Sequence, residues 1–329
     1  MIRLAMVGLG VQGTRFLEAV HGKSDAVSVV SGVTGNEREA MSTRARFGIP
    51  VHATLEEVLA DPGVDGVVLA TPPTVHSAQV CLSAAAGKHV HCEKPFTLAR
   101  KDALAAVEAC ERHGVKLALS YTHRYHPAMQ ALRQVVDSGA IGTVLHAEGN
   151  YSHDWGWGAG SDPNNWRASA GANPAKTRFF TANGVHVVDV LISMFGNVGS
   201  VYSFGKRRAL PYDFLDVFSA HLEFVNGVTA SVNALDGTPF IWRVQVYGDK
   251  GWAEVRDFDL LATNIDRKVT TTKFPAFSPL RFSLEAFARW IEAGEAFPVT
   301  TREAVHGVAA YEGLIESLLT GARVPIVQG

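Results

Sequence analysis

A glycine-rich turn near the amino terminus constrains the fold of this chain more than any other feature. Residues 8–13 read Gly-Leu-Gly-Val-Gln-Gly and directly follow an apolar, β-branched run at residues 2–7. In this G-x-G-x-x-G pattern the first glycine permits a tight turn. The second lets backbone N–H groups approach a pyrophosphate, and the third allows a helix to pack closely on a strand. The turn also opens a predicted helix, whose amino terminus attracts anions. We therefore predict a dinucleotide site that uses Gly8, Gly10, Val11, Gln12 and Gly13.

The rest of the first third of the chain predicts a parallel sheet. Strands are expected at residues 2–7, 27–33, 64–70, 88–92 and 116–119, and helices at residues 12–21, 36–47, 75–86 and 100–113. Strands that alternate with helices of this length form right-handed βαβ units. We therefore expect a doubly wound Rossmann domain, an α/β fold, over residues 1–121.

The pattern of expected strands and helices changes after residue 121. Longer strands are expected at 144–153, 214–224 and 228–234, and helices at about 183–195, 280–293 and 302–320. Asn226-Gly227 separates two of these strands, and Asn-Gly is a strong hairpin signal. A chain of 329 residues is long enough for two domains. Residues 122–329 are thus expected to form a substrate-binding and oligomerisation domain, an α+β fold with a large, mostly antiparallel sheet. The last helix could pack back on the Rossmann domain.

Composition excludes several classes of protein. The 30 basic residues nearly balance the 32 acidic ones, which leaves no basic surface for nucleic acid or an anionic membrane. No uninterrupted apolar stretch reaches the roughly 18 residues of a membrane span. We see no basic leader of a signal peptide, and the 3 scattered cysteines suit reduced thiols, so a cytoplasmic protein is expected. No metal is expected: His89 and His91 share a strand face, but zinc-type spacing is absent.

The usual ribose-binding acid is missing from its expected place. An Asp or Glu is typical about 20 residues after the glycine turn, at the end of the second strand. This chain has Thr34 and Asn36 there, and the nearest acids, Glu37 and Glu39, fall just inside the next helix. Without a carboxylate to repel it, a 2′-phosphate could bind Thr34 and Asn36, with Arg38 nearby. The sequence allows NAD or NADP and slightly favours NADP.

Three further motifs add to the glycine turn. Residues 71–76 read Thr-Pro-Pro-Thr-Val-His, residues 93–95 read Glu-Lys-Pro, and residues 184–189 read Gly-Val-His-Val-Val-Asp. In this order the four motifs resemble the glucose–fructose oxidoreductase / inositol dehydrogenase family (Gfo/Idh/MocA). The resemblance implies NAD(P)-dependent hydride transfer to or from a secondary alcohol–ketone pair of a sugar, inositol or related polyol. It also implies a cis peptide between Lys94 and Pro95, and a homodimer or homotetramer joined through the sheets of the second domain.

Lys94 and His186 are the candidate catalytic residues. Lys94 ends a parallel strand on the side where such sheets bind ligands. Near a cationic nicotinamide its pKa should fall, so that it could give or take a proton. His186 begins a predicted helix, and Asp189, one turn on, could orient it. The alternatives are a surface lysine and a core histidine. Many family members carry an aspartate four residues before this histidine, where this chain has Ala182, so a Lys–Asp–His relay lacks its acid.

The remaining predicted contacts flank these residues. The further cofactor contacts are Thr34, Asn36, Arg38, Thr71, Pro72, Pro73, His76, Glu93, Lys94 and Tyr121, and the substrate contacts are Lys94, Arg124, Trp166, Arg167, Asn183 and His186. His123 is expected to border the nicotinamide with Tyr121. A stretch with Trp155, Trp157 and Trp166 among glycines could form a lid that stacks on a sugar ring. Tryptophans that fill a core or a dimer interface are the alternative.

Two other functions stay open. The tryptophan-rich stretch would also suit a dehydrogenase or reductase of an aromatic dihydrodiol or of a ring-derived keto acid. The non-enzymatic alternative is a cofactor-sensing binding protein that has lost turnover. Its only support is the missing aspartate at Ala182.

Overall fold

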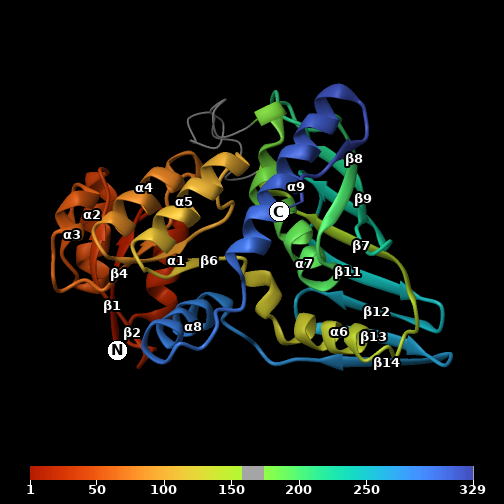
Figure 1. Ribbon diagram of the computed structural model, residues 1–329, viewed down its shortest axis with the longest axis horizontal. Coiled ribbons are helices and arrows are strands. Elements are labelled where there is room, and N and C mark those ends of the chain that lie inside the picture. The colour runs from red at the N-terminus through yellow and green to blue at the C-terminus, as the bar shows by residue number, and fades with distance from the viewer. Residues whose placement is uncertain (158–173, 329) are drawn as a thin grey trace. The chain divides into compact units, whose positions relative to one another are not determined.

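The computed structural model describes residues 1–157 and 174–328. They form two compact units (Figure 1), the first from residues 1–122 with 278–304 and the second from residues 123–277 with those from 305 on. The chain first passes from one unit to the other after residue 122, next to the expected boundary at residue 121. At residue 278 the chain returns to the first unit, which was not expected from the sequence.

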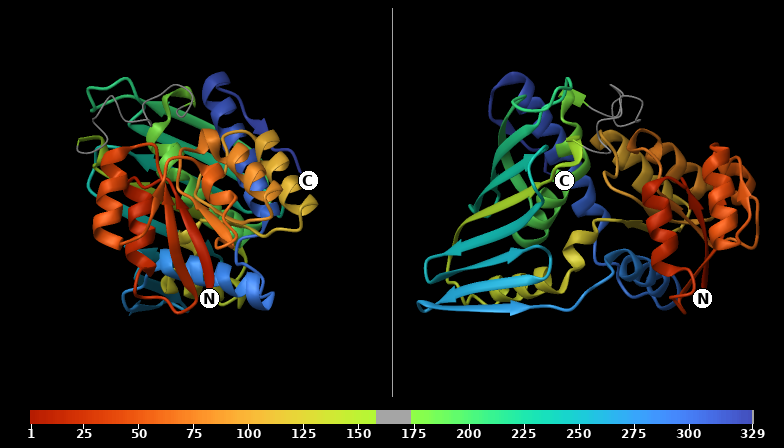
Figure 2. Two further views of the ribbon diagram at one scale, coloured as in Figure 1. Left: turned by 90° about the vertical axis from the view of Figure 1, so that its left-hand side faces the viewer. Right: turned by 180° about the vertical axis from the view of Figure 1, so that it is seen from behind.

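The first unit is built on a parallel sheet of six strands in the order β3-β2-β1-β4-β5-β6. The strands are β1 (Ile2–Val7), β2 (Val27–Val33), β3 (Val51–His52), β4 (Gly66–Leu69), β5 (His89–Cys92) and β6 (Leu117–Leu119). The helices are α1 (Val11–Val20), α2 (Glu37–Phe47), α3 (Leu55–Leu59), α4 (Pro73–Ala85), α5 (Arg100–Arg112) and α8 (Pro279–Ala293). Helices lie on both sides of the strands (Figure 2), which explains why β1 and β4 are apolar and buried almost throughout. The strand order is that of a Rossmann fold, so the predicted fold is confirmed.

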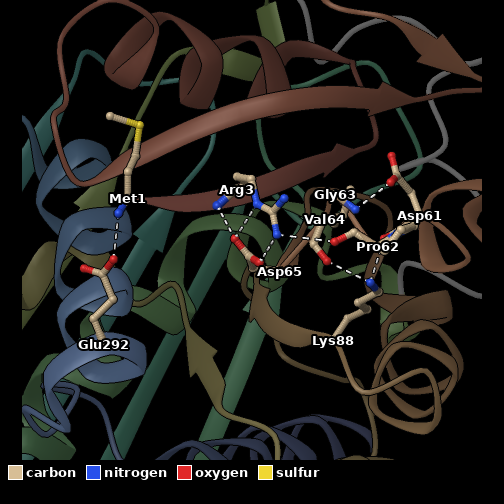
Figure 3. Close-up of polar contacts among 9 residues, drawn as sticks. All are labelled: Met1, Arg3, Asp61, Pro62, Gly63, Val64, Asp65, Lys88 and Glu292. Atoms are coloured by element: carbon tan, nitrogen blue, oxygen red, sulfur yellow. Dashed lines mark hydrogen bonds and ion pairs between the residues drawn. The ribbon is translucent and has the colours of Figure 1, made fainter.

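Polar contacts tie the starts of the strands in this sheet together (Figure 3). Arg3 Nη2 lies 2.6 Å from Asp65 Oδ1, which joins the start of β1 to the start of β4. Lys88 Nζ donates to the carbonyl oxygens of Asp61 and Val64, each at 2.7 Å. The Arg3–Asp65 pair is partly exposed, so solvent screens it and it contributes little to stability. These contacts lie at the opposite end of the strands from the glycine turn and leave the ligand-binding edge to other residues.

Helix α8 belongs to the first unit because its apolar face packs on the parallel sheet. His91 of β5 is fully buried there, and its Nε2 lies 2.8 Å from Ser283 Oγ of α8. The rings of Phe16, Phe287 and Phe297 surround this imidazole. Burial lowers the pKa of His91 to about 3. His91 is therefore a neutral core residue that joins α8 to the sheet.

The second unit is built on a sheet of nine strands in the order β14-β13-β12-β11-β7-β10-β9-β8-β15. The strands are β7 (Val144–Ser152), β8 (Val198–Lys206), β9 (Val217–Phe224), β10 (Thr229–Leu235), β11 (Ile241–Gly248), β12 (Gly251–Arg256), β13 (Leu260–Ile265), β14 (Lys268–Lys273) and β15 (Val324–Pro325). Every pairing is antiparallel except that of β7 with β10. The predicted hairpin at Asn226-Gly227 joins β9 to β10, and Gly227 adopts φ 88°. The predicted mostly antiparallel sheet is confirmed.

Helices α6 (Pro127–Asp137), α7 (Val185–Phe195) and α9 (Thr301–Thr320) lie on one face of this sheet (Figure 1). From Val305 on, α9 belongs to the second unit, where Ser317 Oγ accepts a 2.9 Å hydrogen bond from the backbone N–H of Ser203 in β8. The last helix thus packs on the nine-stranded sheet, whereas the sequence allowed packing on the Rossmann domain. Over residues 1–157 and 174–328, no helix has the length and apolarity needed to span a membrane.

Candidate active site

The glycine turn between β1 and α1 is shaped as an anion cradle. Gly8 has φ 89°, and a Cβ there would lie 2.8 Å from the carbonyl oxygen of Ala70. A Cβ on Gly13 would lie 1.9 Å from the carbonyl oxygen of Gly8, so both positions require glycine. Among the described residues, a Cβ on Gly10 would meet Glu39 Oε1 at 3.6 Å and no nearer atom, which leaves room for a ligand beside the backbone there. Val11, which begins α1, is 77% exposed. These residues fit the pyrophosphate of a dinucleotide at the amino terminus of α1.

Glu93 connects three elements at the carboxyl edge of the sheet. Its buried carboxylate accepts hydrogen bonds from Gln12 Nε2 at 3.1 Å, from Ser120 Oγ at 2.7 Å and from the backbone N–H of Lys94 at 3.2 Å. Burial raises the pKa of Glu93, and the charge of Lys94 and these hydrogen bonds oppose the rise. Glu93 and Gln12 were predicted to contact the cofactor. In the structure their side chains bind each other and tie α1 to the ends of β5 and β6. Sequence reasoning did not single out Ser120.

Lys94 follows β5 directly and is half-buried. Its peptide bond to Pro95 is cis, as the resemblance implied. On the far side of this bond, His76 Nδ1 lies 3.0 Å from the carbonyl oxygens of both Pro95 and Phe96, and its Nε2 lies 2.9 Å from that of Thr71. His76 was predicted to contact the cofactor. It is fully buried, and its ring nitrogens are engaged by backbone carbonyls. Its ring thus ties the turn after Lys94 to the end of β4.

The other predicted cofactor contacts of this edge follow the ends of β4 and β6. Thr71 Oγ1 donates a 2.6 Å hydrogen bond to Gln79 Oε1 of α4. Pro72 is half-buried, and Pro73, in the first turn of α4, is buried. Tyr121, two residues after β6, is only 4% exposed. The structure brings these residues to the same edge of the sheet as the glycine turn and Lys94.

The loop after β2, which was expected to bind a 2′-phosphate, makes hydrogen bonds with the first turn of α2. Asn36 Oδ1 accepts from the backbone N–H groups of Arg38 and Glu39, so this side chain caps α2. Thr34 Oγ1 donates a 2.7 Å hydrogen bond to Glu39 Oε2. Arg38 is exposed. The two polar groups that were expected to accept a 2′-phosphate thus bind within the loop, and a carboxylate lies beside them.

His186 lies in the first turn of α7 and is 4% exposed. Its ring stacks on that of His123, with centroids 3.6 Å apart and an angle of 22° between the planes. The rings of Tyr151, Trp242 and Phe258 lie within 5.5 Å of the His123 ring. His123 was expected to border the nicotinamide, and the structure places it in the second unit, in contact with the candidate catalytic histidine. Trp242 comes from a strand that the sequence did not predict.

A buried ion pair joins the two segments that carry the stacked histidines. Arg124 Nε lies 2.7 Å from Asp189 Oδ2, and Arg124 Nη2 lies 2.6 Å from Asp189 Oδ1. The two side chains are 6% and 5% exposed. Arg124 follows His123 in the chain, and Asp189 lies one turn after His186 in α7. Arg124 was predicted to bind substrate, and in the structure its guanidinium makes this bidentate pair.

The remaining predicted substrate contacts precede α7. Asn183 and Ala182 are half-buried in a short π-helix (Phe180–Gly184). Thr181 Oγ1 lies 2.9 Å from the hydroxyl of Tyr311 in α9, which ties this turn to the last helix. Trp166 and Arg167, with most of the proposed lid, lie outside the described residues. At its start, Trp157 Nε1 donates a 3.0 Å hydrogen bond to the carbonyl oxygen of Gly237.

Comparisons with known proteins agree with this arrangement. A family model described as "Oxidoreductase family, NAD-binding Rossmann fold" matches residues 2–121, and the model of the GFO/IDH/MocA C-terminal domain matches residues 129–254. The chain is 28% identical to D-xylose 1-dehydrogenase (NADP(+)) 2 of Haloferax volcanii, over 98% of both chains. It is 25% identical to inositol 2-dehydrogenase 2 of Saccharopolyspora erythraea, over 99% of this chain and 95% of the relative.

Solved structures share the fold over the whole chain. Levoglucosan dehydrogenase in complex with NADH and levoglucosan aligns with a TM-score of 0.88 at 20% identity, covering 100% of both chains. An NAD-binding oxidoreductase from Klebsiella pneumoniae aligns with a TM-score of 0.85 at 18% identity, again covering 100% of both chains. At these identities the likeness establishes the fold.

Proposed function

The chain belongs to the Gfo/Idh/MocA oxidoreductase family, and from this premise we propose that it transfers a hydride between a nicotinamide dinucleotide and a secondary alcohol of a sugar, inositol or related polyol. The observation that carries the proposal is the open backbone at Gly10, on the same sheet edge as Lys94. Relatives named for D-xylose and inositol support the substrate class.

Lys94 is proposed to move the proton of the reacting hydroxyl. When bound, the nicotinamide supplies the hydride acceptor for oxidation or the hydride donor for reduction. Hydride leaves a carbinol carbon only as the hydroxyl loses its proton, so a base must lie within hydrogen-bond reach of that oxygen. Lys94 is half-buried, and its neighbours on both sides are fixed, Glu93 by Gln12 and Ser120, and Pro95 by His76. This support suits a proton-transfer group that must keep its position.

His186 is proposed to be the second proton-transfer group, either beside the oxygen or as a relay to solvent. Replacing His186 by alanine should lower kcat less than truncation of Lys94 does, and it should change the shape of the pH–rate profile because one titrating group is lost. Steady-state kinetics across the pH range measures both effects. His113→Ala is a suitable control, since His113 is an exposed residue after α5. A profile that His186→Ala leaves unchanged in shape would assign the ring a packing role against His123.

One activity screen distinguishes the two alternative functions from the proposed one. The aromatic rings around His123 would also suit an aromatic dihydrodiol. Purified protein is mixed with polyols, sugar acids and aromatic diols, each with NAD and NADP, and nicotinamide absorbance is followed. Turnover of polyols or sugars supports the proposal, whereas turnover of aromatic diols alone would replace it. Any turnover excludes a cofactor-sensing binding protein, and its complete absence would favour one.

The protein is proposed to assemble through the open face of the nine-stranded sheet. Along β7 the buried residues Ala147 and Gly149 alternate with half-exposed residues His146, Glu148 and Asn150. A Cβ on Gly149 would meet Val187 of α7 at 2.1 Å, so the second set of residues lies on the face away from that helix. An antiparallel sheet can leave one face for another layer to cover. We expect light scattering at micromolar concentration to give the mass of a homodimer or homotetramer, and a monomeric mass would contradict this.

A further inference from the structure

The carboxylate of Glu39 reaches back from α2 to the glycine turn. Asn36 caps the helix, which puts Glu39 in its first turn. Thr34 Oγ1, one residue beyond the end of β2, donates to Glu39 Oε2 at 2.7 Å. The other oxygen, Oε1, lies 3.6 Å from the position that a Cβ on Gly10 would take. The carboxylate thus lies between the end of β2 and the second glycine of the turn.

In a Rossmann domain this is the region that binds the ribose of the adenosine half of the dinucleotide. With the pyrophosphate on the glycine turn, the ribose extends toward the end of the second strand, where an acid at the strand end normally accepts from its 2′-hydroxyl. This chain has Thr34 there and no acid. Glu39 supplies the missing carboxylate from the helix, and the Thr34 hydroxyl holds it in place through Oε2. Oε1 remains on the side of the glycine turn.

We propose that Glu39 is the ribose-binding acid of this chain and that it makes the enzyme prefer NAD to NADP. The inference rests on the proposed function and deepens it, since it assumes a dinucleotide on the glycine turn. A carboxylate accepts a hydrogen bond from a 2′-hydroxyl but repels a 2′-phosphate, which carries negative charge. The slight preference for NADP expected from the sequence depended on the absence of an acid at this place. Arg38 is exposed and adjacent, so it could partly offset the repulsion without removing it.

Calorimetric titration of the full chain with NAD⁺ and with NADP⁺ tests the proposal. Wild type should bind NAD⁺ at least about tenfold more tightly than NADP⁺. The 2′-hydroxyl of NAD⁺ gains a hydrogen bond to the carboxylate, whereas the 2′-phosphate of NADP⁺ meets a like charge. Glu39→Gln should weaken NAD⁺, strengthen NADP⁺ and bring the ratio of the two dissociation constants close to one. Thr34→Ala should shift the ratio the same way by a smaller factor, because it frees the carboxylate without removing it. It also gives a second readout if Glu39→Gln folds poorly.

Glu37→Gln is the matched control. It removes the same charge from the same helical turn, but its carboxylate is exposed and pairs with Arg44 at 3.3 Å, so the ratio should stay at the wild-type value. The proposal is overturned if wild type binds both cofactors equally, or if Glu39→Gln leaves the ratio unchanged while both still bind. If neither cofactor binds to wild type, the proposed function fails and the inference fails with it. The two failures are therefore distinguishable.

Discussion

Truncating Lys94 to alanine should lower kcat by about 10²–10⁴-fold, the usual range for a positioned acid–base group. The affinity for the cofactor should change far less, because the pyrophosphate is proposed to bind at the backbone of Gly10 and the start of α1. Steady-state kinetics gives kcat, and calorimetric titration gives the dissociation constant of the cofactor. Near-normal kcat with lost cofactor affinity would make Lys94 a cofactor contact only, and the proton would then belong to His186 alone.

Two variants separate proton transfer from charge and from general surface effects. Lys94→Arg keeps the positive charge, but a guanidinium does not release its proton, so kcat should remain low. Recovery of most of the activity in this variant would show that charge alone suffices. Lys101→Ala removes an exposed lysine in the first turn of α5 and should leave kcat at the wild-type value.

Replacing Asp189 by alanine should lower the free energy of unfolding by about 3–5 kcal/mol, because the buried guanidinium of Arg124 loses the carboxylate that neutralises it. The large effect follows from burial, since the two side chains are 6% and 5% exposed. Urea unfolding of Asp189→Ala, and of Asp189→Leu, Arg124→Met and the double variant Arg124→Met/Asp189→Leu, measures it. The double variant should be more stable than either single one, since apolar side chains can replace a buried pair at little cost. If the losses in free energy of unfolding of the two single variants simply add in the double variant, Arg124 and Asp189 do not stabilise each other.

The same set of variants tests whether the pair positions the stacked histidines. The double variant should fold, yet its kcat should stay low and its pH–rate profile should differ from that of wild type, because His123 and His186 lose the contact that fixes their spacing. A merely structural pair would leave both readouts at their wild-type values once stability is restored.

The sequence predicted every strand of the first sheet except the two-residue β3, but only β7, β9 and β10 of the nine-stranded sheet. The strands of the first unit read as apolar, β-branched runs because helices cover both faces of the sheet. By contrast, β14 (Lys268–Lys273) is exposed at every residue, so it carries no apolar period and was not predicted. For α6 a signal was present and was missed, namely Pro127 at the start and Ala128, Met129 and Leu132 on its buried face.

The motifs located the candidate site residues but not their partners. Gln12 and Glu93 are 81 residues apart in the chain, and Arg124 and Asp189 are 65 apart, so tertiary structure alone brings them together. Glu39 is different, because it lies three residues after the helix-capping Asn36. In the capping-box pattern such a glutamate accepts from the backbone N–H of the capping residue, but here Glu39 accepts from Thr34 Oγ1, and the N–H of Asn36 donates to Thr34 Oγ1 instead. The sequence therefore placed Glu39 near the strand end, but its contact with Thr34 is seen only in the structure.

Transfer of deuterium from substrate to cofactor shows whether the hydride passes directly from the carbinol carbon to the nicotinamide. A polyol or sugar that is turned over in the screen is deuterated at the reacting carbinol carbon and oxidised by the purified protein. The mass of the reduced nicotinamide is then measured. Direct hydride transfer predicts that the reduced cofactor carries the deuterium, in wild type and in the residual turnover of Lys94→Ala. Reduced cofactor without deuterium, or no reduction with any polyol or sugar, would contradict the account.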